Sequence, residues 1–176
     1  FKFPENYLTS VVDYLIENQM NDGGYNCMAP RSGAVHSSLH TTLSVLEGFN
    51  EFRKNDYTYK FKDIQNIEKD CIEFILQHRL FKSDKNGKII NKDFLKFSFP
   101  CRWRYDILRC LDYFQHAKIN YDPRMDEAIE ALLDKRRKDG YWNLQAKWPG
   151  EFHFEMERPG NASRINTLRA LRVLKH

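Results

Sequence analysis

The 176-residue chain lacks a long apolar run, has few cysteines and carries little excess charge of either sign. No window approaches the roughly 20 apolar residues that cross a bilayer, so we expect no transmembrane segment and no signal peptide. Four irregularly spaced cysteines predict free thiols in a cytoplasmic protein rather than a disulfide framework. The net charge of +4, with most basic residues matched by acids, does not favour binding to nucleic acid.

What the chain does contain is an internal repeat. An amphipathic segment ends in Asp-Gly-aromatic at residues 22–25 and again at 139–142, and a middle copy at 72–79 keeps the apolar positions without that ending. A second, more apolar segment follows each copy, and the three align through Leu43, Leu108 and Leu168. Both sets recur with a period of about 60 residues, which is typical of stacked helical hairpins.

Apolar residues at three- and four-residue steps predict helices over about 6–20 and 36–52, and further helices beginning at Asp63, Pro100, Asp122 and Ser163. These form three hairpins, at approximately 6–53, 63–117 and 122–176, in one domain or fragment covering residues 1–176. One-faced helices alternate with helices that are apolar on several sides. The alternation predicts an all-α fold with an outer and an inner layer, in which the inner helices start at one common end.

Four segments carry a resemblance to a known family: residues 22–27, 36–43, 97–106 and 163–171. The chain resembles the terpene cyclase and protein prenyltransferase superfamily, and within it the uncharacterised bacterial prenyltransferase or squalene-oxidase repeat proteins. The resemblance implies an α/α-toroid, here a partial barrel, with a central cavity for an apolar or isoprenoid-like molecule. Members usually have five to seven hairpins, so three hairpins imply either missing N-terminal hairpins or a homo-oligomer.

The chain also departs from the family. It has no Asp-x-Asp-Asp motif, the proton donor of squalene and hopene cyclases. Asp22 and Cys27 are too far apart to match the Asp-x-Cys pair that binds zinc in protein prenyltransferases. Whether the chain is an enzyme is therefore left open, and the catalytic residues are unknown.

If the inner helices share one end, the residues at their starts and in the preceding loops converge there. Helix N-termini together with arginines attract anions such as a diphosphate. Asp106, beside Arg102 and Arg104, is expected to stay ionised. The alternative is that these groups have a structural role instead of binding a ligand: they cap helices and pair with each other. The candidate ligand-binding residues are Cys27, His36, His40, Arg102, Trp103, Tyr105, Asp106, Glu155, Arg164 and Asn166.

Three further hypotheses remain. His36 and His40 stand four residues apart, which would place them on one helical face, and with Cys27 they could ligate zinc in a zinc-dependent transferase. Cys27 and a nearby histidine could instead form a nucleophile and its base. The hairpin array could also serve as a scaffold that grips a peptide or protein, without catalysis.

Overall fold

The computed structural model describes residues 2–151 and 153–175 and is mostly helical over that range. It divides into two compact units, unit 1 at Phe1–Gln77 and unit 2 at His78–His176. The division falls inside the second predicted hairpin, between its two helices. Helical content agrees with the expected all-α class. In the described part of the chain, no helix has the length and apolar character needed to cross a membrane.

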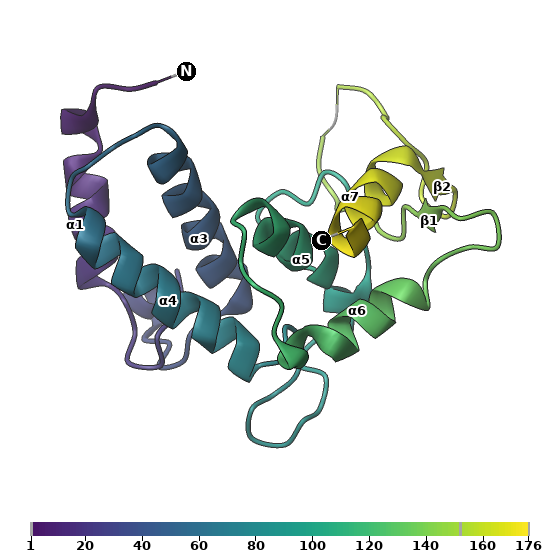
Figure 1. Ribbon diagram of the computed structural model, residues 1–176, viewed down its shortest axis with the longest axis horizontal. Coiled ribbons are helices and arrows are strands. Elements are labelled where there is room, and N and C mark those ends of the chain that lie inside the picture. The colour runs from purple at the N-terminus through teal and green to yellow at the C-terminus, as the bar shows by residue number, and fades with distance from the viewer. Residues whose placement is uncertain (1, 152, 176) are drawn as a thin grey trace. The chain divides into compact units, whose positions relative to one another are not determined.

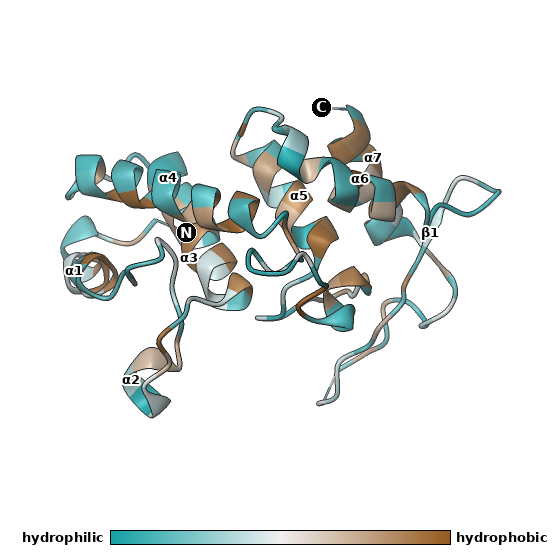
Figure 2. Ribbon diagram, turned by 90° about the horizontal axis from the view of Figure 1, so that it is seen from below, coloured by the Kyte–Doolittle hydropathy of each residue, from teal (hydrophilic) through white to brown (hydrophobic). Residues whose placement is uncertain are grey.

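Unit 1 contains η1 (Glu5–Tyr7), α1 (Thr9–Glu17), α2 (Ala29–Ser32), α3 (Leu39–Lys54) and α4 (Phe61–Gln77). Helix α4 packs on α3 and, to a lesser extent, on α1 (Figure 1). Hydrophilic residues cover one side of α4, and its apolar residues are buried (Figure 2). The core of the unit includes Val12, Tyr25, Leu43, Leu46, Phe49, Ile64, Cys71 and Ile75.

Unit 2 contains η2 (Lys92–Leu95), α5 (Ile107–His116), η3 (Pro123–Met125), α6 (Asp126–Leu133), β1 (Trp142–Asn143), β2 (Ala162–Ser163) and α7 (Arg164–Lys175). Helix α5 packs on α7 and on α6. Strands β1 and β2 pair antiparallel in the register Trp142 to Ser163, a small sheet that the sequence did not predict. The core includes Leu80, Phe97, Tyr105, Ile107, Leu108, Leu132 and Trp142.

The first and third repeats fold in the same way, down to single hydrogen bonds. Tyr25 donates its hydroxyl hydrogen bond to the carbonyl of Leu15 at 2.8 Å, and the Trp142 indole N–H donates to the carbonyl of Leu132 at 2.7 Å. The backbone N–H of each aromatic residue donates to a threonine hydroxyl on the following inner helix, Tyr25 to Thr42 and Trp142 to Thr167. We call this arrangement the aromatic clasp. It supports the alignment of the two repeats.

The turn that leads into the clasp requires glycine. Gly23 has a φ of 88° and Gly140 has a φ of 86°, a left-handed region in which other residues are strained. The Gly23 N–H donates to the carbonyl of Met20, and the Gly140 N–H donates to that of Arg137. The Asp-Gly-aromatic pattern thus encodes one turn used twice.

Several helix starts differ from the prediction: α3 begins at Leu39 rather than His36, α4 begins at Phe61 ahead of the expected cap Asp63, and α5 shows the largest difference. The fourth helix, expected from Pro100, is α5 and starts at Ile107. Arg102 has a φ of 52°, which interrupts any helix from Pro100, and Asp106 is extended. The Asp106 carboxylate accepts a hydrogen bond from the Arg109 N–H at 2.8 Å, so the N-cap lies at Asp106. The expected cap at Asp122 is confirmed by its bond from the Arg124 N–H.

The clasp gives a stability prediction. Replacing Thr42 with Val keeps the side-chain shape but leaves the buried N–H of Tyr25 without its acceptor, which costs about 1–3 kcal/mol. Thr167→Val should cost a similar amount through Trp142. Urea unfolding measures both, with the exposed Thr58→Val as the matched control, expected within about 0.5 kcal/mol of the parent. If Thr42→Val and the control behave alike, the threonine does not hold the clasp.

Candidate functional site

The three candidate residues of unit 1 do not form the predicted zinc site. Ser38 is the N-cap of α3, so His36 precedes the helix and does not share a helical face with His40. The carbonyl of His36 accepts from the Asn26 amide, and Cys27 is exposed. Across residues 2–151 and 153–175, no three His, Cys, Asp or Glu side chains are placed to hold a metal ion together.

Two candidates in unit 2, Tyr105 and Asn166, are buried and connect loops and helices. Tyr105 donates to the carbonyl of Leu80 at 2.5 Å and packs edge-on against Phe94. The Asn166 amide nitrogen donates to the carbonyls of Phe97 and Asn143, while its amide oxygen is buried with no hydrogen-bond partner. These placements match the structural alternative, in which the residues hold loops and helices together.

Asp106 is also buried, and its electrostatics differ from the expectation. Burial raises the pKa of its carboxyl above the ordinary value of 3.8. The positive charge of Arg169 and hydrogen bonds from the backbone of Arg109 and Ser98 act in the opposite direction and lower this pKa. Arg169 lies on α7 and also pairs with Asp112 at 3.1 Å. The cation that acts on this carboxyl is therefore Arg169 rather than Arg102 or Arg104, and the desolvation of the carboxylate outweighs the effect of Arg169 on the pKa.

The arginines of the loop before α5 bind other groups. Arg102 donates to the carbonyls of Pro149 at 3.2 Å and of Glu151 at 3.4 Å, so it ties this loop to the one at 147–157. Arg104 stacks on two tryptophans: its guanidinium carbon lies 4.8 Å from the ring centroid of Trp103 and 4.0 Å from that of Trp148. Trp103 is 61% exposed, so this stacked group borders solvent.

Two inner-helix N-termini already hold carboxylates. Asp106 accepts from the N–H of Arg109 in α5, and Glu157 accepts from the N–H of Arg164 in α7 at 2.8 Å. Protein carboxylates thus satisfy these donors, which were expected to attract an anionic ligand. Arg164 itself is exposed to solvent.

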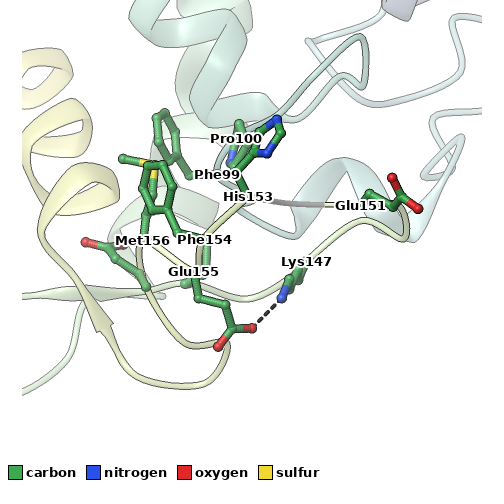
Figure 3. A pocket seen from close by; sticks show the side chains of 10 residues that line it. Phe99, Pro100, Lys147, Glu151, His153, Phe154, Glu155 and Met156 are labelled. Carbon is green, nitrogen blue, oxygen red and sulfur yellow. Dashed lines mark hydrogen bonds and ion pairs between the residues drawn. The ribbon is translucent and has the colours of Figure 1, made fainter.

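A cavity of about 220 Å³ lies beside Glu157 in unit 2. Its apolar lining is grouped, with Phe99, Phe154 and Met156 close together, whereas Glu155 and Lys147 point toward one another as an ion pair (Figure 3). One oxygen of Glu157 is buried and has no hydrogen-bond partner among the described residues. The lining residues are Phe99, Pro100, Leu144, Lys147, Glu151, His153, Phe154, Glu155, Met156 and Glu157.

Of the ten candidates, Glu155 lines this cavity, and Arg102 tethers the backbone of its loop. The other lining residues were missed, because they lie in loops where no periodicity marks an inward face. The alternation of apolar and charged residues at 153–157 was a usable signal. The cavity also differs from the predicted central one, since loops rather than inner-helix starts line it.

A second cavity of about 260 Å³ lies among α5, α6 and α7, lined by residues such as Phe114, Met125 and Val173. It is slightly larger, but no charged side chain lines it. Ligand sites combine an apolar surface with a few polar groups that orient the ligand, so the first cavity is the better candidate.

Comparisons of the chain with models of protein families, with curated proteins and with solved structures find no match. The resemblance to the terpene cyclase and prenyltransferase superfamily thus rests on the residues of the chain itself.

The buried carboxyl of Asp106 predicts a pH dependence. Because the pKa of Asp106 is raised in the folded protein, the folded state binds this proton more tightly, and the contribution of Asp106 to the unfolding free energy falls as pH rises from about 4. Asp106→Asn mimics the protonated form and keeps an N-cap acceptor. Its unfolding free energy, relative to that of the parent, should increase from pH 4 to pH 7 in urea titrations. A pH-independent difference would contradict the raised pKa.

Proposed function

We propose that the chain is a helical-hairpin repeat protein of the α/α-toroid type, and that unit 2 binds a small, largely apolar molecule. The observation that carries the binding proposal is the apolar cavity beside Glu157. The repeated clasp and the alternation of outer and inner helices support the toroid arrangement. Free thiols on all four cysteines support a reducing, cytoplasmic location.

The size of the cavity limits the ligand. A cavity of about 150 Å³ holds benzene, and drug-sized ligands need about 300–1,000 Å³. At about 220 Å³, the cavity suits a molecule between these limits, such as a single isoprenoid unit. A triterpene such as squalene exceeds it.

The charges around the cavity limit the head group. Three carboxylates, those of Glu151, Glu155 and Glu157, lie in the lining, and Lys147 already pairs with Glu155. Glu157 already accepts hydrogen bonds from the backbone N–H groups of Arg164 and Ile165. The negative lining favours a neutral alcohol or an amine, whereas a diphosphate would be repelled. The favoured ligand is therefore a short apolar molecule with a donor head group.

Methyl NMR tests the proposal. With 3-methyl-2-buten-1-ol as the probe, the labelled methyl signal of Met156 should shift in a saturable way, while those of Met20 and Met28 stay unchanged. Met125 lines the second cavity and reports binding there instead. Met156→Glu should abolish binding because it places a charge in the apolar lining. The exposed Met28→Glu is the matched control; loss of binding in both, or no shift at Met156, would refute the proposal.

Arg102 should act on the same site as a positioning residue. Its two bonds to the backbone at Pro149 and Glu151 hold the lining loop, and a Cβ at Gly150 would come within 2.6 Å of its guanidinium. Arg102→Ala should weaken probe binding roughly three- to tenfold, about 0.7–1.4 kcal/mol, by loosening the loop. The exposed Arg31→Ala is the control in the same titration. Unchanged affinity would show that the loop holds its shape without Arg102.

A further inference from the structure

The helix of the second repeat buries a face that is exposed in the first repeat, and the central position of that face is also buried in the third. Leu15, Ile75 and Leu132 align, so Val11, Cys71 and Ala128 are equivalent. Cys71 and Ala128 are 0% exposed, whereas Val11 is 54% exposed. Tyr7 and Tyr14 lie one turn to either side of Val11 and are exposed as well. We call Tyr7, Val11 and Tyr14 the leading face.

In unit 1, the contacts show what buries this face on the second outer helix. The Cys71 thiol donates to the carbonyl of Gly23, and Asp70 accepts from the Gln19 amide. Arg53 of α3 donates two hydrogen bonds to the carboxylate of Glu68, at 2.7 and 2.9 Å. The face of α4 therefore packs on the turn and the inner helix of the preceding hairpin. In unit 2, α6 likewise packs on the helix that precedes it, α5.

The inner helices show the complementary pattern at the other end of the chain. Leu43 and Leu108 are 0% exposed, but the equivalent Leu168 is 58% exposed. Leu171 is exposed too, although the equivalent Leu46 and Leu111 are buried. We call Leu168 and Leu171 the trailing face. Arg164 and Lys175 lie one turn to either side of them on the same side of α7. Figure 2 shows the hydrophobic residues along α7.

The charges at the two faces complement each other. In unit 1, Arg53 near the end of α3 reaches Glu68 in the first half of α4, so the inner helix and the next outer helix run antiparallel. The same packing would bring Arg164, at the start of α7, close to Glu17, at the end of α1. Both residues are exposed.

We propose that the leading face of one chain packs on the trailing face of a second copy, as α4 packs on α3 and α6 on α5. The contact is head-to-tail, so each chain contributes a different surface. It continues the interface that already joins successive hairpins inside the chain. Each face is apolar at its centre; Arg164 flanks the trailing face and Glu17 follows the leading face along α1.

Sedimentation velocity on the whole chain tests this. The parent should show an average mass above that of a monomer, falling on dilution. Val11→Asp and Leu168→Asp should each be monomeric, because each lacks one face. Mixing them should restore a 1:1 dimer, since the first variant keeps its trailing face and the second its leading face. This rescue distinguishes a head-to-tail contact from a symmetric one.

Val35→Asp is the matched control, because Val35 is 79% exposed and lies outside both faces; it should associate like the parent. If an aspartate variant fails to fold by circular dichroism, Val11→Ser and Leu168→Gln replace the pair. A parent that is monomeric at every concentration, variants that still associate, or a mixture that stays monomeric would each overturn the proposal. Probe binding at Met156 reports on a different surface, so it stays independent of this result.

Discussion

The packing of the first and third hairpins depends on one hydrogen-bonded group, in which an aromatic residue joins α1 to α3 and α6 to α7. Tyr25 and Trp142 each donate twice, once from the ring to the outer helix and once from the backbone to a threonine. The ring fills the core while its polar atom is satisfied, so burial carries no unpaired donor. Gly24 is needed beside it, because a Cβ there would lie 2.7 Å from the Thr42 hydroxyl.

The repeat and its turns were predictable because they depend on local rules: the periodicity of Leu15 and Leu132, and the glycine at 23 and 140. The middle copy was less predictable. It lacks the aromatic ending, and Tyr105 instead enters from the start of an inner helix to bond the carbonyl of Leu80. That contact joins residues 25 positions apart in chain segments without periodicity, so no sequence pattern indicated it. The late start of α5 follows from the same irregular loop.

The candidate site shows why residue type alone misplaces a pocket. Arginines and helix N-termini suggested an anion site, yet the carboxylates of Asp106 and Glu157 occupy those N-termini. Sequence showed that such groups were present but not which of them paired. Once the N-termini are internally satisfied, the remaining acids give the neighbouring cavity a negative lining. The same capping that stabilises the inner helices therefore selects against an anionic ligand and in favour of a donor.

The two exposed faces follow from the physics of a repeat array. In a stack of hairpins each unit contacts its neighbours, and a face that no adjacent hairpin covers stays exposed. Repeat proteins normally make such terminal faces polar. Here η1 and α1 carry the exposed residues Tyr7, Val11 and Tyr14, and α7 carries the exposed Leu168 and Leu171, residue types suited to an interior contact. The packing of α4 on α3 shows the geometry in which such faces are covered.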